Sequence, residues 1–236
     1  MTQKVVIIGG SSGMGLAIAK AAVAKGKKVV IASRSVAKLN QAKAEIGGDV
    51  ETEPVDLTLE VSVKELFAKI GNYDALLITP SVGVNGPFME VDIPAARQAF
   101  ENKFWGSYYA AKHGVAGLDK TNGSITFFSG AVVEKPSPGL SVLAAINGGL
   151  EALAKSLAVE LAPIRVNVVS PGLVVTPLYS GIPEAYRQSY FDSVAMQLPL
   201  KRVGQPEDIA ELALFLIENK YMTGAVINID GGVRLV

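Results

Sequence analysis

The sequence has no cysteine and only one histidine, His113, among its 236 residues. Without cysteine the chain cannot build a disulfide scaffold, a zinc–thiolate site, an iron–sulfur cluster or a thiol nucleophile. One histidine is too few for a His-rich metal site. We therefore expect no metal centre, and side chains of other kinds must carry any chemistry.

The chain also lacks an excess of either charge and any long apolar run. Its 22 basic residues balance its 22 acidic residues, so the net charge does not indicate a nucleic-acid partner. No apolar stretch reaches the ~20 residues that a membrane span needs, and the run from Val5 to Ile8 is too short for a signal peptide. We expect a cytoplasmic protein with a small-molecule substrate and without a nucleic-acid or membrane partner.

Short runs rich in β-branched residues alternate with longer helical patterns along the chain. This alternation is typical of an α/β fold in which helices cover both faces of a doubly wound parallel sheet. The expected strands lie near residues 4–8, 28–32, 50–54, 75–79, 124–128, 164–169 and 225–230. The expected helices lie near residues 14–25, 36–46, 60–70, 94–117, 141–161 and 206–218. No repeat or Pro/Gly-rich linker divides the chain, so we expect one domain over residues 1–236.

A glycine-rich turn, Gly9-Gly10-Ser11-Ser12-Gly13-Met14-Gly15, follows the first expected strand and opens the first expected helix. Glycines there permit positive φ in a tight turn and let a pyrophosphate approach the backbone. The helix N-terminus adds free N–H groups and the positive end of its dipole. We interpret the turn as a dinucleotide-binding site, and a merely flexible loop is the alternative. The expected contacts are Gly9, Ser11, Ser12, Gly13, Met14 and Gly15.

With this turn the chain resembles the short-chain dehydrogenase/reductase family. The Gly-x-x-x-Gly-x-Gly spacing matches that family, and residues 202–210 and 223–232 resemble its C-terminal signature. The resemblance implies a seven-stranded Rossmann-type fold and a homo-oligomer, either a dimer or a tetramer. It also implies cofactor contacts by Asp56 and Leu57 at the adenine, by Thr79 and Pro80 after the fourth strand, and by Pro171, Gly172, Val174 and Thr176 at the nicotinamide amide.

The end of the second expected strand bears on which dinucleotide binds. An acidic residue there bonds the ribose 2′-OH of NAD, whereas an arginine accommodates the 2′-phosphate of NADP. This chain reads Ser33-Arg34-Ser35 and has no acid at that place. Arg34 can donate paired hydrogen bonds to a phosphate, and Ser33 adds a hydroxyl. We therefore expect NADP(H), with a solvated arginine at a strand end as the alternative.

The residues that carry proton transfer in the resembled family are replaced in this chain. The family uses a Tyr and a Lys four residues later, which share one helix face, together with a Ser and an Asn. In the alignment Leu143 stands at the Tyr and Asn147 at the Lys. Gly130 stands at the Ser, beside Ser129, and Lys103 stands at the Asn. Ordinary ketone reduction should therefore be poor, because Leu143 cannot donate a proton.

A second Tyr-x-x-x-Lys pair, Tyr108 and Lys112, lies on the helix after the fourth expected strand. In the resembled family that helix leads away from the nicotinamide and often contributes to subunit packing. We expect a packing or interface role for this pair, and a surface or interface place for His113.

Loss of the tyrosine leaves three hypotheses about the chemistry. In the first, another group replaces an acid that typically contributes roughly 10²–10⁴-fold to the rate. Lys103 is the best candidate, because burial beside a cationic nicotinamide lowers a lysine pKa. Ser129, Ser141 and Thr79 can orient an oxygen but are poor acids, and Asn147 can still donate to the nicotinamide ribose. In the second, an iminium or conjugated enone needs no protein acid at hydride transfer. In the third, the protein binds NADP(H) without redox chemistry.

Residues 178–200 fall where the family has its substrate lid. They carry few charges and several large apolar or aromatic side chains, namely Tyr179, Tyr186, Tyr190, Phe191 and Met196. With Phe104, Trp105 and Phe127 expected nearby, they favour an apolar or aromatic substrate, and ordinary lid packing is the alternative. The leading prediction is an NADP(H)-dependent oxidoreductase for a small apolar carbonyl, enone or imine-like substrate with a non-standard proton route. The alternative is a non-catalytic, regulatory NADP(H)-binding protein.

Overall fold

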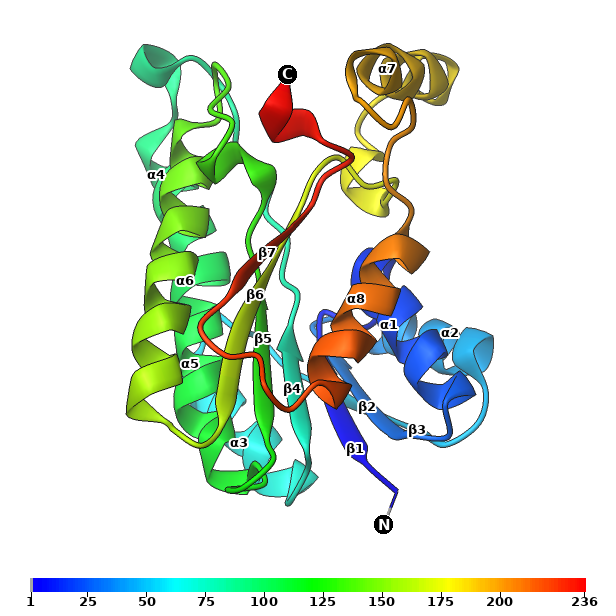
Figure 1. Cartoon of the computed structure of the whole chain (residues 1–236), viewed down its shortest axis with the longest axis vertical. Helices are drawn as coiled ribbons and strands as arrows, with labels where there is room; N and C mark the ends of the chain where they lie inside the picture. Colours follow the sequence, from blue (N-terminus) through cyan, green and yellow to red (C-terminus); the bar gives the residue numbers. More distant parts are fainter. Residues whose placement is uncertain (1) are drawn as a thin grey trace.

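A parallel sheet runs through the centre of the computed structural model, which describes residues 2–236 (Figure 1). Its strands are β1 (Lys4–Ile8), β2 (Lys28–Ser33), β3 (Val50–Pro54), β4 (Ala75–Ile78), β5 (Ser124–Phe128), β6 (Arg165–Pro171) and β7 (Val226–Ile229). The seven strands lie in the order β3-β2-β1-β4-β5-β6-β7, and each neighbouring pair is parallel. The order reverses between β1 and β4, which confirms the predicted doubly wound Rossmann-type fold.

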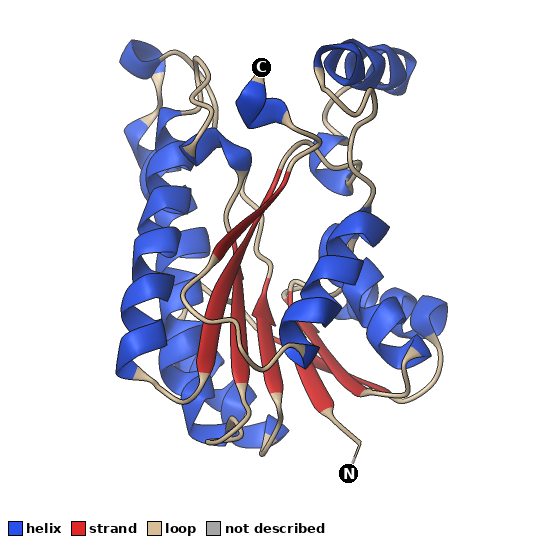
Figure 2. Cartoon of the chain, viewed as in Figure 1, coloured by secondary structure: helices blue, strands red, loops and turns tan. Residues whose placement is uncertain are grey.

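Helices cover both faces of this sheet (Figure 2). One face carries α1 (Gly13–Ala24), α2 (Val36–Ile46) and α8 (Pro206–Glu218), and the other carries α3 (Glu60–Ile70), α5 (Gly106–Gly114) and α6 (Ser141–Glu160). The short helix α4 (Ile93–Ala99) precedes α5. Helix α7 (Glu184–Gln197) lies beyond the carboxyl ends of the strands, inside the segment 178–200 that the sequence predicts as a lid.

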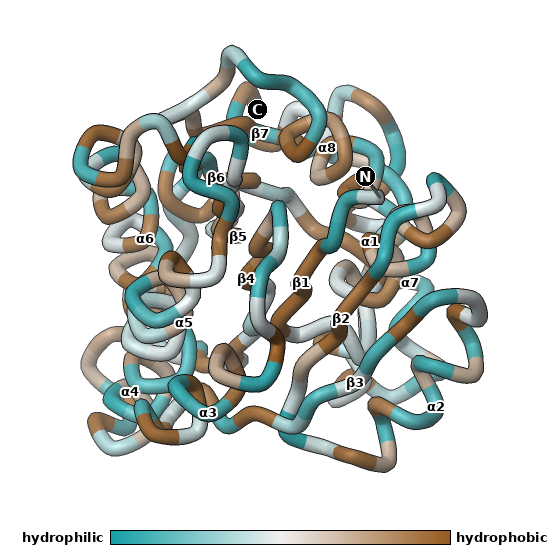
Figure 3. The backbone as a smooth tube through the Cα atoms, turned by 90° about the horizontal axis from the view of Figure 1, so that it is seen from below, coloured by the Kyte–Doolittle hydropathy of each residue, from teal (hydrophilic) through white to brown (hydrophobic). Residues whose placement is uncertain are grey.

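The strands are apolar along their length because both of their faces are covered. Val6 and Ile8 of β1 point into the core layer under α3, α5 and α6, whereas Val5 and Ile7 point into the layer under α1 and α8. Figure 3 shows the same pattern, since β1 and β2 are coloured as hydrophobic through most of their length. Burial on both faces is the physical reason that these strands read as continuous apolar runs rather than as alternating ones.

The helix predicted over residues 94–117 is wrong as a single element. The chain forms α4, then a π-helical turn over Phe100–Trp105, then α5 and a last 3₁₀ turn over Val115–Gly117. Gly106, the first residue of α5, packs tightly against the loop that follows β3. A Cβ added to Gly106 would stand 2.7 Å from Leu57 Cβ. A π turn widens the helix and displaces its side chains, and such turns often occur at functional sites. Lys103 lies inside this one.

The expectation that no apolar stretch is long enough to cross a membrane needs one correction. By length and composition alone α6 passes that test, although a core helix of a soluble protein passes it as well. In this structure α6 packs against β5 and β6, and its inward face carries the polar residues Asn147 and Glu151. The geometry is that of a helix that covers a sheet.

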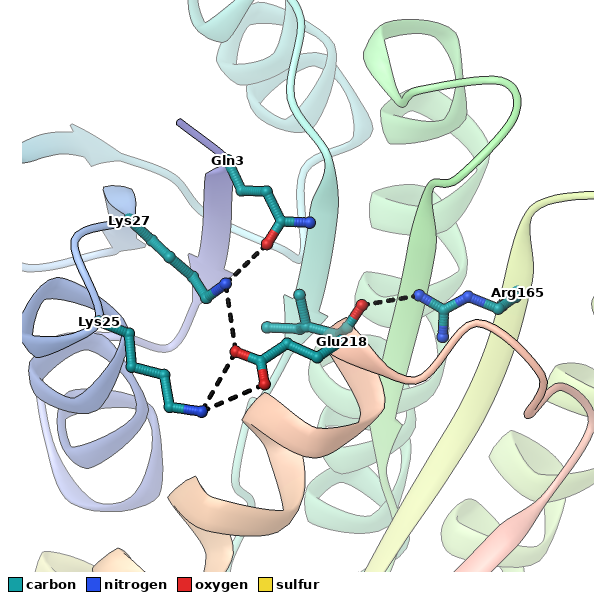
Figure 4. A network of polar contacts seen from close by, with 6 residues as sticks. Gln3, Lys25, Lys27, Arg165 and Glu218 are labelled. Carbon is teal, nitrogen blue, oxygen red and sulfur yellow. Dashed lines mark hydrogen bonds and ion pairs between the residues drawn. The ribbon is translucent and has the colours of Figure 1, made fainter. Parts of the chain in front are cut away.

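A polar network joins the C-terminal end of α8 to residues at the amino ends of β1, β2 and β6 (Figure 4). Arg165 is buried and donates to the carbonyl oxygens of Leu216 and Ile217, at 2.6 and 2.9 Å, near the C-terminus of α8. Next to it, the Glu218 carboxylate lies 3.2 Å from Lys25 Nζ and 3.4 Å from Lys27 Nζ. A cation near the last carbonyls of a helix satisfies them and complements the helix dipole.

Candidate cofactor and active site

The turn after β1 has the conformation that its glycines predict. Gly9 and Gly13 have φ values of +89° and +53°, in the left-handed region that favours glycine. Gly15 packs directly against the backbone of Gly9, and a Cβ added to Gly15 would stand only 2.4 Å from the carbonyl oxygen of Gly9. Helix α1 begins at Gly13, so its free N–H groups open onto the space above the turn.

That space is a cavity of about 190 Å³ at the carboxyl ends of β1, β2 and β4. The structure brings many of the predicted cofactor residues to its wall, namely Gly9, Ser11, Ser12, Gly13, Met14, Gly15, Ser33, Arg34, Leu57, Thr79, Pro80 and Thr176. Ser81 and Asn102 also line it, although the sequence interpretation did not assign them there.

Asp56, which the resemblance assigns to the adenine, does not line this cavity, whereas its neighbours Val55 and Leu57 both do. The Asp56 carboxylate accepts hydrogen bonds from the backbone N–H and the hydroxyl of Thr58, at 2.9 and 2.8 Å. These bonds, with a smaller contribution from Arg34, hold its pKa below the usual value. Asp56 therefore holds the local turn, in a hollow that it shares with Arg34.

Two groups at the end of β2 fit the 2′-phosphate of NADP(H). Ser33 Oγ is buried and has no hydrogen-bond partner among residues 2–236. Arg34 is exposed and makes no ion pair with any carboxylate that the structure describes. A phosphate between them would accept hydrogen bonds from both. Together with the glycine turn, these residues fit a dinucleotide that carries an extra phosphate.

A second cavity, of about 330 Å³, continues from the first toward α6 and α7. Met14, Thr79, Pro80 and Thr176 line both cavities, so a ligand along the first extends into the second. The structure places the remaining predicted residues on this second wall, namely Lys103, Ser129, Asn147, Pro171, Gly172 and Val174. Leu143, at the place of the family's tyrosine, lines it too.

Lys103 is an unusual residue of this wall, because it carries an ionisable amine and yet is only 6% exposed. Burial lowers its pKa from 10.5 to about 8. The described residues that line the cavity include Lys103 and Lys135 but no aspartate or glutamate. No carboxylate between residues 2 and 236 forms an ion pair with Lys103, so the cavity is electropositive where Lys103 enters it.

Asn147 and Ser129 lie close to this region from α6 and from the end of β5. Asn147 is fully buried, its Oδ1 has no hydrogen-bond partner among the described residues, and its Nδ2 faces Gly130. Ser129 Oγ is also buried without a partner in the described part of the chain. Three polar side chains, one of them cationic, thus converge on the cavity from the π turn, β5 and α6.

Only some of the expected aromatic residues reach the cavity. Tyr179 and Tyr190 line it and pack on each other, with ring centroids 6.1 Å apart. Tyr186 and Met196 are exposed, and Phe191 is buried behind Tyr179. The expectation for Phe104, Trp105 and Phe127 is wrong. Phe127 points into the core, Phe104 packs on Gly149, and Trp105 stacks on Tyr109 outside the site, whereas Phe128 lines the cavity.

The second Tyr-x-x-x-Lys pair lies away from both cavities. Tyr108 packs edge-on against Trp105 on the outer surface. Lys112 Nζ and His113 Nε2 both contact the Glu60 carboxylate, at 3.4 and 2.7 Å. These contacts join α5 to the first turn of α3.

Several residues of the second cavity carried no signal in the sequence. They come from the segment between β5 and α6, from the loop after β4 and from the C-terminal turn, namely Val82, Ala131, Val132, Lys135, Ser137, Leu140 and Val233. Loop residues have no periodicity, so only the fold brings them together.

Comparisons with known proteins agree with this geometry. A family model described as enoyl-(acyl carrier protein) reductase matches residues 9–234. The chain is 34% identical to "Short-chain dehydrogenase/reductase ATR9" of Stachybotrys chlorohalonatus, over 99% of this chain and 97% of that protein. It is 32% identical to "Carbonyl reductase family member 4" of Xenopus laevis, over 100% and 99% of the two chains. A crystal structure of a small-chain dehydrogenase in complex with NADPH superposes with a TM-score of 0.86 at 36% identity, over the whole of both chains.

Proposed function

The chain belongs to the short-chain dehydrogenase/reductase family, and on that premise we propose that it is an NADP(H)-dependent reductase of a small, largely apolar carbonyl compound or enone. We further propose that Lys103 takes the place of the family's usual proton donor. The observation that carries the proposal is the buried lysine on the cavity wall, without a carboxylate partner among residues 2–236.

The cofactor would lie across the two joined cavities. The glycine turn and the N-terminus of α1 would hold the pyrophosphate, and Ser33 with Arg34 would hold the 2′-phosphate. Asn147 would donate to the ribose next to the nicotinamide, from the wall of the second cavity. When bound, NADPH supplies a hydride to the substrate carbon.

Lys103 would stabilise the negative charge that this reduction creates. As a carbonyl or enone gains a hydride, negative charge develops on its oxygen. An ammonium group already held in a desolvated wall stabilises that charge without reorganisation of solvent. With a pKa of about 8, Lys103 is mostly charged at neutral pH and is also acidic enough to give up a proton. The oxygen–hydrogen bond of the product then forms as an N–H bond of Lys103 breaks.

The charge of the cavity distinguishes between the substrates that the sequence leaves open. An iminium ion brings a positive charge, and a site for it needs a carboxylate nearby. The described lining instead holds Lys103 and Lys135 and no acid. The lining therefore favours a carbonyl or an enone over an iminium. The aromatic wall of Tyr179, Tyr190 and Phe128 favours a substrate with an apolar or aromatic body.

Leu143 supports one competing function, which is NADP(H) binding without catalysis. It occupies the place of the acid and offers only packing to a ligand. The competing function predicts tight NADPH binding and no oxidation.

A titration with NADPH and with NADH tests the proposal, followed in the same cuvette by absorbance of the reduced nicotinamide with ketones, enones and iminium ions. We expect tighter binding of NADPH than of NADH, and oxidation by a ketone or an enone. Tight binding with a flat trace across every substrate would favour the non-catalytic function. Oxidation by iminium ions alone would contradict the assigned substrate class.

A further inference from the structure

Glu151 is a buried carboxyl group that the proposed reduction does not use. It follows Leu143 and Asn147 at intervals of four residues on α6, so all three share the inward face of the helix. The residue is 9% exposed, and its Oε1 has no hydrogen-bond partner among residues 2–236. Burial raises its pKa above the usual value for glutamate; the Ser129 hydroxyl and Lys155 act in the opposite sense, and Glu134 acts in the same sense.

Ser129 connects this carboxyl to the cavity. It follows β5, and its side chain has the parity of Ile125 and Phe127, which point to the layer under α6. Its hydroxyl faces the Glu151 carboxyl, without a well-aligned hydrogen bond between them, and the residue lines the cavity together with Lys103. A hydroxyl can accept a proton on one side while it donates its own on the other.

Glu134 is a second, more exposed carboxyl group whose charge acts on Glu151. Its side chain is 46% exposed, and its negative charge contributes to the raised pKa of Glu151. It accepts a hydrogen bond of 3.0 Å from Asn228, whose Oδ1 is buried and has no partner in the part of the chain that the structure describes. Glu134 and Asn228 thus lie between the surface and the region of Glu151, at the side of the sheet where β7 runs.

Lys103 has no comparable connection. It is buried in the π turn and makes no hydrogen bond or ion pair within residues 2–236. Once it has given its proton to a product, it must regain one before the next turnover. A carboxylic acid transfers its proton readily to an amine whose pKa is about 8. Glu151 is a buried carboxyl group that faces Ser129, a residue of the same cavity wall.

We propose that Ser129 and Glu151 form a proton relay that recharges Lys103 between turnovers, with Glu134 at its entrance from solvent. The proposal rests on the proposed function. In the recharging step a water molecule in the cavity gives a proton to Lys103 Nζ as it takes one from the Ser129 hydroxyl, because Ser129 Oγ makes no direct hydrogen bond to Lys103. The Glu151 O–H bond breaks as its proton moves to Ser129 Oγ, and a hydronium ion from solvent re-forms that bond and leaves a water molecule. Only protons move, and nothing is oxidised or reduced. Ser129 and Glu151 are thus positioning residues, which act through Lys103.

Glu151→Gln tests the relay, because it keeps the shape of the side chain and removes the transferable proton. With Lys103 charged beforehand, we expect a first turnover within about twofold of the native rate, followed by turnovers slowed at least about tenfold. The matched control is Glu160→Gln, on the exposed face of the same helix, which should leave both phases unchanged. Glu151→Asp should restore part of the later rate. Equal steady-state rates in Glu151→Gln and the native protein would overturn the relay, and so would an equal loss in the first and the later turnovers.

A second readout needs neither cofactor nor substrate. Infrared spectra of the free protein, recorded just above the pH at which ordinary glutamates ionise, should show the C=O stretch of one protonated carboxyl. That band should vanish in Glu151→Gln and persist in Glu160→Gln. Its absence from the native protein would overturn the relay. If the native protein oxidises no NADPH with any substrate while the band is present, the proposed function is wrong, although Glu151 is still a protonated buried acid.

Discussion

The Nδ2 atom of Asn147 lies 3.1 Å from the point at which a side chain on Gly130 would place its Cβ. The amide of α6 thus fills the space that the missing side chain leaves after β5. In the resembled family these two positions hold a lysine and a serine, so the two replacements compensate each other in space. Asn147 keeps a donor on the cavity wall, and Gly130 gives it room.

Gly130→Ala should therefore weaken NADPH binding. Its φ of 173° is ordinary extended backbone, so the substitution costs no backbone strain, and the methyl group acts only by displacing the Asn147 amide. We expect NADPH to bind about threefold to tenfold more weakly, which corresponds to about 1 kcal/mol. Fluorescence titration measures it. Gly148→Ala is the matched control, because the nearest atom to its new Cβ is 3.9 Å away, and equal affinity losses in both variants would contradict this account.

Arg34→Asp should reverse the preference between the two dinucleotides. The carboxylate would repel a 2′-phosphate and accept from a free 2′-OH. We expect NADPH to bind at least about tenfold more weakly and NADH to bind as well as before or better. Lys43→Gln, near the end of α2, is the charge control and should change neither affinity. Unchanged NADPH binding in Arg34→Asp would remove Arg34 from the phosphate site.

Burial of Lys103 predicts how stability changes with pH. A pKa lowered from 10.5 in the unfolded chain to about 8 in the fold means that the unfolded chain binds more protons between these values. Native stability attributable to Lys103 should therefore rise with pH across that window, by up to about 3 kcal/mol. Lys103→Met should be the more stable protein below about pH 8, and the difference should disappear above pH 10.5. Urea unfolding of both proteins across this range measures it, and a difference that does not change with pH would contradict the burial of a charge.

Arg165→Met should destabilise the fold without touching the cofactor site. It removes two hydrogen bonds to the last turn of α8, at the amino end of β6, whereas the glycine turn lies at the carboxyl end of β1. Buried carbonyls that lose a charged donor cost about 2–4 kcal/mol. Lys25→Gln, which removes an exposed contact to Glu218, should cost less than about 1 kcal/mol. Denaturant midpoints measure both, and NADPH affinity in the folded range should stay native.

We propose that a second copy of the chain packs on the outer face of α6. Most of the apolar stretch of this helix is not buried in the structure, and Val159 is 81% exposed. Val159→Lys should shift a dimer or tetramer toward smaller species in sedimentation velocity. Val61→Lys places the same charge on the exposed face of α3 and should not do so. A native protein that sediments as a monomer would contradict the proposal.

The sheet and the glycine turn could be predicted because their signals are local. Apolar runs such as Val5–Ile8 and a turn with Gly9 and Gly13 at positive φ have few other solutions. The π turn over Phe100–Trp105 could not be predicted, because its residues continue the helical pattern on either side; the structure also packs Gly106 against Leu57, which is distant in the sequence.

Errors within the site have a similar origin. Phe127 and Phe128 are neighbours, and only the strand's parity decides that Phe128 reaches the cavity while Phe127 enters the core. Glu151 gave no signal, because a single acid in a helical pattern reads as a solvent-exposed face. The structure instead places Glu151 on the buried face of α6, where its carboxyl group faces the Ser129 hydroxyl.

The most direct test of the account is the first turnover of NADPH oxidation by Lys103→Met, compared with the native protein on the best ketone or enone. A rapid-mixing absorbance trace with saturating NADPH isolates the step that Lys103 is proposed to assist. We predict a loss of roughly 10²–10⁴-fold with NADPH affinity within about twofold of native. A first turnover at the native rate would show that another group stabilises the negative charge on the substrate oxygen, and it would contradict the central role of Lys103.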